Sequence, residues 1–470
     1  MKAVSKYFII NVIFTAQILP NLIIVSNTHD NGVGSLRAAI LMSGQLSAPR
    51  YIVFRIQSDL KKIYIKSVLP PIPSDTILDA TTQPGYDGIP VVCINGSAVK
   101  GPGFLLNGVS RVTIKGFAIT DFDQHGISII NSSSENTITS NVIGINPENE
   151  QPAGNGGAGI NVENSSWNTF AHNTISSNGG IFASSGVQIL NNSHFNHVRG
   201  NFIGTNMYGS FALGNNRSGI LVSGHCTNNK IGGELIEDRN IISGNMQGIL
   251  LDNGSTRTVI QNNYLGTDSQ GLIALGNING IHLRGESHDN IIGGSESSEG
   301  NLISGNTNNG IQIFNAYNNQ IIGNIIGLDK TGMKALGNSS GVIIAFAHSF
   351  DNSVRKNYIS GNEEVAIRIG GGANKTLIES NVIGMAIESK KIIANRFGIV
   401  IHQKDTSSNW VLNNVISASK LNNIRLEDDV CNNTIKNNEF VLDEPVPFTM
   451  STALDNIYVG TFALNNILEN

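Results

Sequence analysis

The sequence contains little charge. Asp, Glu, Lys and Arg together make up 14% of its 470 residues, against about 25% in an ordinary globular domain. The formal net charge is -5, and no run of Lys or Arg is longer than a pair. Because the backbone of a nucleic acid is bound by clustered positive charge, we expect no nucleic-acid partner.

Cysteine is also scarce. Cys93, Cys226 and Cys431 are an odd number at wide spacing, which fits neither a disulfide framework nor a zinc-binding pattern. We interpret them as ordinary buried or turn thiols and expect no metal centre and no cofactor.

Apolar runs long enough to cross a bilayer are missing. Lys2 and Lys6 precede an apolar run over residues 7–16. This segment resembles an export signal, and its apolar run is too short to span a membrane. No A-x-A cleavage site is clear, and the alternative to a signal peptide is that the apolar run forms a first buried strand. We predict a signal peptide in residues 1–22 and a secreted or cell-surface protein, with no membrane span in the mature chain.

Glycine, asparagine and isoleucine are abundant instead, with 52 Gly in the chain. Few long helix-forming runs occur, which favours stacked short strands and turns. A chain of this length could form two or three domains at roughly 150 residues each, but the even composition favours one elongated domain.

An internal repeat organises most of the chain. N-x-[IL]-G segments start at Asn141, Asn201, Asn263, Asn324 and Asn381, which are 60, 62, 61 and 57 residues apart. A second series of N-x-I-S segments interleaves with the first. Each period of about 60 residues therefore contains two coils of a solenoid.

A G-I-x-I element marks each coil. Clear copies start at Gly126, Gly159, Gly186, Gly219, Gly248, Gly280, Gly310, Gly341 and Gly398, and degenerate copies at Gly103, Ala366, Asn423 and Asn456. Two further strand signals follow it, N-x-[IV] and N-x-I. Since side chains alternate along a strand, both apolar residues of G-I-x-I point inward and x points outward. The pattern predicts an all-β, right-handed parallel β-helix of about 13 coils with three strands per coil.

Asparagines separate the second and third strand signals. Asn tolerates the left-handed backbone conformation and bonds to neighbouring backbone, so we predict an asparagine ladder at this bend, formed by Asn141, Asn173, Asn201, Asn263, Asn324, Asn357, Asn381 and Asn414. Longer turns after the third strand place Asn206, Asp268 and Asp329 at equivalent positions. These residues fit ordinary Asx turns; a calcium site is possible there but unsupported.

These elements resemble the bacterial right-handed parallel β-helix repeat proteins of the pectin-lyase-like superfamily. The stretch from Gly34 to Ile40, G-S-L-R-A-A-I, is similar to the N-terminal signature of the CSLREA type, with Gly34 in place of the cysteine. The resemblance implies a short capping helix over residues 35–42 that covers the open end of the solenoid. We divide the chain into an N-terminal cap and first rungs (23–102), β-helix repeats (103–442), and a last coil with C-terminal cap (443–470).

The resemblance also implies that chemistry, if present, lies on the face made by the G-I-x-I strands. With coils about 4.8 Å apart, Asp252, His282 and Arg284 should cluster there, with Phe314 next in line. Asp252 or His282 could transfer a proton while Arg284 neutralises a carboxylate or orients hydroxyls. The alternative is an exposed salt bridge worth about 0 to 1 kcal/mol.

Other polar residues on this face are weaker candidates. A second group contains Arg368, His402, Arg425 and Glu427, of which Arg368 and His402 are candidate ligand-binding residues. Several histidines follow the G-I-x-I strands at uneven offsets, which favours polar turns over a metal stack: His194, His225, His288 and His348. The motif sets of polygalacturonases, alginate epimerases and pectate lyases are missing.

We therefore expect an exported or surface-associated β-helix that binds a polysaccharide or a cell-surface partner. A polysaccharide lyase or glycoside hydrolase acting at Asp252, His282 and Arg284 is the alternative. Host recognition of the phage-tail kind is a third possibility, although no trimerising segment is visible.

Overall fold

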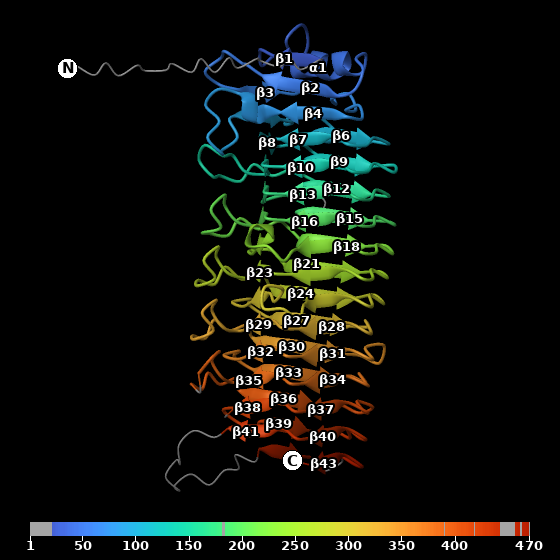
Figure 1. Cartoon of the computed structure of the whole chain (residues 1–470), viewed down its shortest axis with the longest axis vertical. Helices are drawn as coiled ribbons and strands as arrows, with labels where there is room; N and C mark the ends of the chain where they lie inside the picture. Colours follow the sequence, from blue (N-terminus) through green and yellow to red (C-terminus); the bar gives the residue numbers. More distant parts are fainter. Residues whose placement is uncertain are drawn as a thin grey trace, which may run out of the picture.

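The computed structural model describes residues 21–180, 184–389, 391–417, 419–441, 456–460 and 463–469. The chain winds into a rod in which strands of successive coils stack along the long axis (Figure 1). All strand pairs in the described part of the chain are parallel, and they form three sheets. The predicted all-β, right-handed parallel β-helix with three strands per coil is confirmed.

Sheet C contains the G-I-x-I strands. Its 13 described strands are β6 (Phe104–Asn107), β9 (Ile127–Ile130), β12 (Ile160–Glu163), β15 (Val187–Leu190), β18 (Ser218–Ser223), β21 (Gln247–Asp252), β24 (Asn279–Arg284), β27 (Asn309–Phe314), β30 (Ser340–Ala345), β33 (Val365–Gly370), β36 (Phe397–Ile401), β39 (Ile424–Leu426) and β42 (Ile457–Val459).

Sheet A contains the second strand of each coil. Its 16 described strands are β1 (Leu22–Val25), β2 (Arg50–Phe54), β4 (Thr76–Asp79), β7 (Thr113–Lys115), β10 (Thr137–Thr139), β13 (Thr169–Ala171), β16 (His197–Arg199), β19 (Lys230–Gly232), β22 (Val259–Gln261), β25 (Ile291–Gly293), β28 (Gln320–Ile322), β31 (Ser353–Arg355), β34 (Leu377–Glu379), β37 (Trp410–Leu412), β40 (Thr434–Lys436) and β43 (Ile467–Glu469).

Sheet B contains the third strand of each coil. Its 14 described strands are β3 (Lys62–Tyr64), β5 (Val92–Asn95), β8 (Phe117–Thr120), β11 (Val142–Ile143), β14 (Thr174–Ile175), β17 (Phe202–Ile203), β20 (Ile241–Ile242), β23 (Tyr264–Leu265), β26 (Leu302–Ile303), β29 (Ile325–Ile326), β32 (Tyr358–Ile359), β35 (Val382–Ile383), β38 (Val415–Ser417) and β41 (Glu439–Val441).

The solenoid has about 15 turns, slightly more than the 13 predicted. Sheet C does contain 13 described strands, so the G-I-x-I count is right for that sheet. Sheet A begins earlier, with β1, β2 and β4 in rungs that have no strand in sheet C. The sequence count missed these rungs because they carry no G-I-x-I element.

The core is a stack of aliphatic side chains from all three sheets. In β24, Ile281 and Leu283 are fully buried, and Ile281 lies in register with Ile249 and Ile311 of the neighbouring coils. Burying a large aliphatic side chain stabilises the fold by about 1.5 to 3 kcal/mol. Each coil therefore depends on the coil above and the coil below for its stability.

Three asparagine ladders connect the coils. The predicted ladder between sheets A and B is confirmed and also includes Asn240, Asn301 and Asn438; each side-chain amide donates to Oδ1 of the next Asn, as from Asn263 to Asn301 at 3.0 Å. Two more ladders were not predicted. One precedes sheet A and includes Asn168 and Asn196, and one follows sheet B.

The ladder asparagines do not adopt the left-handed conformation that we expected at this bend. The preceding residue does: Ser140, His172, Asn262 and Lys356 have φ between 54° and 56°. The physical reason is that the side chain of the ladder Asn must point into the coil, where it hydrogen-bonds the backbone carbonyls of neighbouring strands. The sharp change of chain direction therefore occurs at the residue before the ladder asparagine.

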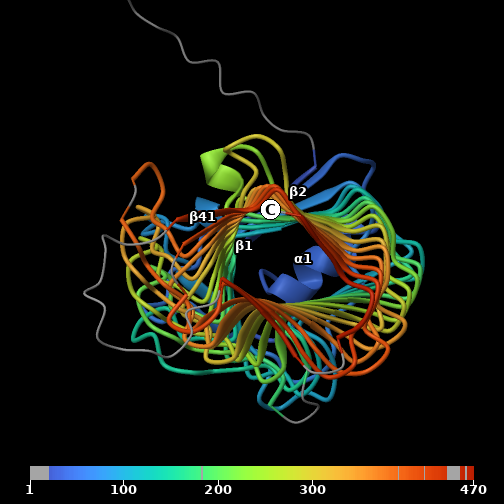
Figure 2. The same cartoon turned by 90° about the horizontal axis from the view of Figure 1, so that it is seen from below.

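Helix α1 (Leu36–Ser43) closes the N-terminal end of the rod, as the resemblance implied. Ser35 caps it by accepting a hydrogen bond from the backbone N–H of Ala38 at 3.2 Å. Leu36 and Ile40 are buried against the first coils, and Figure 2 shows α1 lying across the outline formed by the three sheets. Short 3-10 helices occur at Ala80–Thr82 (η1) and Ile236–Asp238 (η2).

Two predicted segments fall largely outside the described residues. These are residues 1–20 of the predicted signal peptide and residues 443–455 of the predicted last coil. No helix in the described ranges combines the length and the apolar character that a membrane crossing requires. Cys93, Cys226 and Cys431 are free thiols.

Candidate functional site

The outer face of sheet C presents the side chains that the sequence repeat places there. The x residues form one column in register from coil to coil: Ser128, Asn161, Gln188, Leu221, Leu250, His282, Gln312, Ile343, Arg368, Val400, Arg425 and Tyr458. Two residues further along the strand, Ser223 pairs with Asp252, and Arg284 pairs with Phe314. The predicted register is therefore reproduced.

Asp252 and Arg284 form an ion pair across adjacent coils. Arg284 donates to Oδ2 of Asp252 from Nη2 at 2.8 Å and from Nε at 3.1 Å. The side chains of Arg284 and Asp252 are 42% and 21% exposed, so solvent screens the attraction. The second carboxylate oxygen of Asp252 accepts a hydrogen bond from the backbone N–H of Asn253.

His282 lies next to this pair and is mostly covered. Burial lowers its pKa to about 4; the positive charge of Arg284 acts in the same direction, and Asp252 opposes it. Within the described part of the chain, its buried Nε2 has no hydrogen-bond partner. At neutral pH the ring is therefore an uncharged side chain that packs edge-on to Phe314, with ring centroids 5.7 Å apart.

Phe314 belongs to an aromatic surface next to the ion pair. Its ring meets Phe346 edge to face, with centroids 4.9 Å apart, and Phe346 is 46% exposed. On the adjoining turn, His288, Tyr317 and Phe350 stack face to face, each pair of centroids 4.8 Å apart. Aromatic rings thus continue from the face of sheet C onto its edge.

Arg368 and His402 form a separate group. One coil, that of β30, separates Arg368 from the coil of Phe314. His402 lies over Gly370, where an added Cβ would be 2.7 Å from Nε2 of the imidazole. Burial lowers the pKa of His402, Arg368 lowers it further, and Asp428 and Glu427 oppose this.

Arg425 and Glu427, predicted in the same second group, contact each other directly. The Arg425 guanidinium also lies over the ring of Tyr458, 5.0 Å from its centroid. Both charged groups are therefore engaged within the protein.

The predicted turn residues have structural partners. Oδ1 of Asp268 accepts hydrogen bonds from the backbone of Leu272 and Ile273 at 2.8 and 3.0 Å, as the Asx-turn interpretation predicts. Nδ1 of His194 accepts from the backbone N–H of Thr227. In the part of the chain that the structure describes, no group of three or more His, Cys, Asp or Glu is placed to hold a metal ion.

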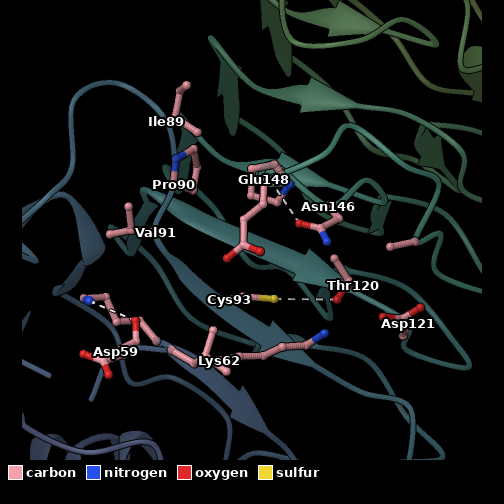
Figure 3. Close-up of a pocket in the computed structure, with 14 residues that line it drawn as sticks. Asp59, Lys62, Ile89, Pro90, Val91, Cys93, Thr120, Asp121, Asn146 and Glu148 are labelled. Carbon is pink, nitrogen blue, oxygen red and sulfur yellow. Dashed lines mark hydrogen bonds between the residues drawn. The ribbon is translucent and has the colours of Figure 1, made fainter. Parts of the chain in front are cut away.

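Sequence reasoning missed a cavity on the outside of sheet B near the N-terminal end. Its volume is about 300 Å³, and segments 59–62, 89–91 and 146–148 form its walls. Figure 3 shows the Glu148 carboxylate pointing into it, above Cys93, which contacts Thr120 at 3.8 Å. Because burial raises the pKa of the Cys93 thiol, the thiol is protonated at neutral pH and is a poor nucleophile. The only signal in the sequence was the break in the repeat at these rungs.

A second cavity of about 300 Å³ lies at the corner of sheets A and B. Two insertions form its walls, residues 233–239 and 294–300, and the Arg239 guanidinium lies 4.2 Å from the centroid of the Tyr264 ring. Insertions in a solenoid map to loops on one face, so the longer spacing before the N-x-I-S segments could have indicated these two loops.

Comparisons with known proteins agree with the fold. The family model described as "right handed beta helix region" matches residues 102–297. The crystal structure of the Dettilon tailspike protein is similar, with a TM-score of 0.51 and 16% identity over 82% of this chain and 69% of that chain.

Two enzyme structures are more distant. A double mutant of the periplasmic alginate epimerase AlgG has a TM-score of 0.41 and 11% identity, covering 90% of this chain and 84% of its own. DFA-IIIase from Arthrobacter chlorophenolicus A6 has a TM-score of 0.43 and 11% identity, covering 84% and 94%. No curated protein sequence matches this chain. At 16% identity, the likeness to the tailspike protein establishes the fold alone.

Proposed function

We propose that this right-handed β-helix protein is exported or surface-associated and binds glycans on the outer face of sheet C. The observation that carries the proposal is the surface made by Phe314, Phe346 and the Asp252–Arg284 ion pair. The similarity to the tailspike protein supports the β-helix fold that carries this surface, and the N-terminal sequence supports export.

The chemistry of this surface suits a sugar. The faces of a sugar ring carry C–H groups that pack against aromatic rings, and its hydroxyls need polar partners at fixed positions. Phe346 supplies an exposed ring. Arg284 supplies a planar set of N–H donors whose orientation Asp252 fixes.

Binding is better supported than catalysis at this position. Arg284 engages the Asp252 carboxylate, and burial keeps His282 uncharged with Nε2 covered. A group that transfers a proton must reach the reacting atom. Both candidate proton-transfer groups therefore have roles within the protein that compete with catalysis.

The test is affinity electrophoresis of the purified protein in gels that contain soluble plant, algal or bacterial polysaccharides, followed by calorimetry on the best ligand. Phe346→Ala and Arg284→Gln should each weaken binding about tenfold. Phe211→Ala is the matched control, because Phe211 is similarly exposed and lies on the turn between sheets B and C.

If none of the polysaccharides slows the migration of the parent protein, the proposal is refuted. Equal loss of binding in Phe211→Ala would show that the effect is not local to sheet C. New reducing ends or unsaturated products in the same mixtures, abolished by Asp252→Ala, would replace the binding role with a lyase or hydrolase activity.

A further inference from the structure

An exposed aromatic pair lies on the turn from sheet C to sheet A, far from the surface of Phe314. Trp167 and Phe195, on adjacent coils, stack with centroids 4.1 Å apart and planes 7° apart. Trp167 remains 58% exposed and Phe195 42% exposed, although each covers part of the other. A pair that served only to bury apolar surface would leave less of its area in solvent.

A polar hollow is formed by the turns that carry this pair and by the corresponding turn of the coil before them. Ser132, Ser134, Asn164, Ser166 and Asn192 line it, and its volume is about 320 Å³. It contains hydroxyl and amide groups and no charged side chain. Ser166 directly precedes Trp167 in the chain, so the ring and one wall of the hollow belong to the same turn.

Most polar groups of the hollow are not engaged within the protein. Among the described residues, the side chains of Ser132, Ser134, Asn164 and Asn192 make no hydrogen bond, whereas the Ser166 hydroxyl accepts one from the backbone N–H of His194 at 2.9 Å. Two buried side chains stabilise the turn instead: the Ser165 hydroxyl accepts a hydrogen bond from the backbone N–H of Ser133, and the Asn168 amide donates to Asn196. The outer set is therefore not required for the turn itself.

We propose that Trp167 and this hollow form a second binding site, which takes an uncharged sugar residue. The inference rests on the glycan-binding function proposed above and extends it to a new position. The Trp167 ring packs against the C–H face of the sugar, and the neutral hydroxyl and amide groups hydrogen-bond its hydroxyls. A carboxylate-bearing sugar is disfavoured, because the hollow offers no cation.

The new site is independent of the Phe314 surface. Three coil steps separate β12, which precedes Trp167, from β21, which contains Asp252, and five separate it from β27, which contains Phe314. At 4.7–4.9 Å per step these separations are about 14 and 24 Å along the rod. Substitutions at this distance with no shared partners are expected to act independently.

The two tryptophans of the chain allow a direct test. Trp410 lies on β37 of sheet A and is 38% exposed. Trp410→Phe leaves Trp167 as the single tryptophan, and Trp167→Phe leaves Trp410. Each variant is titrated with maltohexaose, cellohexaose and mannohexaose and with the polysaccharide that the intact protein binds best, while tryptophan emission and calorimetric heat are recorded.

We expect at least one neutral ligand to shift or quench the emission of Trp167 and to leave that of Trp410 unchanged. Trp167→Ala and Asn164→Ala should weaken this binding about tenfold, and Trp410→Ala should not change it. Circular dichroism of each variant checks that the coils are intact.

The failure of this inference differs from the failure of the proposed function. If the intact protein binds a glycan while the Trp167 emission and the affinity of Trp167→Ala stay unchanged, the second site is refuted and the Phe314 surface stands. Binding of acidic glycans alone would also refute the second site. If no glycan binds the intact protein, both proposals are wrong.

Discussion

His282 should make the stability of the β-helix depend on pH. Its pKa falls from 6.5 to about 4 in the folded chain, because burial and the nearby Arg284 disfavour the charged imidazole. In the unfolded chain the imidazole is solvated and protonates near pH 6.5. The unfolded state therefore binds a proton more readily than the folded state over the window between these two values.

The magnitude follows from the two pKa values. At pH 7 both states are mostly neutral at His282, and the group contributes almost nothing to the pH dependence. As pH falls through 6.5, protonation stabilises the unfolded state, so the free energy of unfolding drops. The loss is about 2 kcal/mol at pH 5 and approaches about 3 kcal/mol near pH 4, where the folded state also begins to protonate.

The measurement compares the parent protein with His282→Gln in urea unfolding at pH 7, 6 and 5. Carboxylates also titrate in this range, but they are common to both proteins, so the difference between the two free energies isolates His282. Between pH 7 and pH 5, the free energy of unfolding of the variant should rise by about 2 kcal/mol relative to that of the parent. The packing against Phe314 that the variant loses adds an offset that is the same at each pH. His348→Gln, at an exposed position, controls for the removal of an imidazole. A difference between parent and His282→Gln that stays constant with pH would refute the reasoning.

Two further predictions concern the ladder and the cap. Asn263→Leu removes hydrogen bonds to the Asn301 side chain and to buried backbone carbonyls, which should lower the free energy of unfolding by about 3 to 5 kcal/mol in urea titration; an effect below about 1 kcal/mol would show that the ladder is not a main source of stability. Ile40→Glu places a charge where Ile40 is 1% exposed in the capping helix, so the end of the rod should open and the protein should elute as larger species in size-exclusion chromatography. An elution volume unchanged from that of the parent protein would contradict the proposed role of the cap.

The sequence was sufficient to predict the coil, because the coil is a local pattern that recurs. The alternation in Gly280–Leu283 places Ile281 inward and His282 outward, and the repeat spacing then fixes which residue lies over which in the next coil. That is why the contact between Asp252 and Arg284 could be predicted from coil spacing alone. The first rungs were miscounted because they lack the repeated element.

The turns were harder to predict, because their lengths differ from coil to coil. His288 was considered only as one of several turn histidines, whereas it stacks on Tyr317. The cavity beneath Glu148 joins segments that are about 30 to 90 positions apart and that do not repeat. Such contacts depend on how loops fold back over a sheet, which no periodicity records.

The turn that carries Trp167 shows how the repeat can support a binding surface. The buried Asn168 donates to Asn196 at 3.0 Å, and the backbone N–H of Ser165 donates to the Ser193 hydroxyl at 3.1 Å, so hydrogen bonds to the next coil fix the chain on both sides of the ring. A ring held in this way loses little conformational freedom when a ligand binds, which reduces the entropic cost of binding. The buried residues of the ladder therefore determine the position of the ring, while the exposed neighbours on the same turn remain free to vary and would set the specificity of the proposed site.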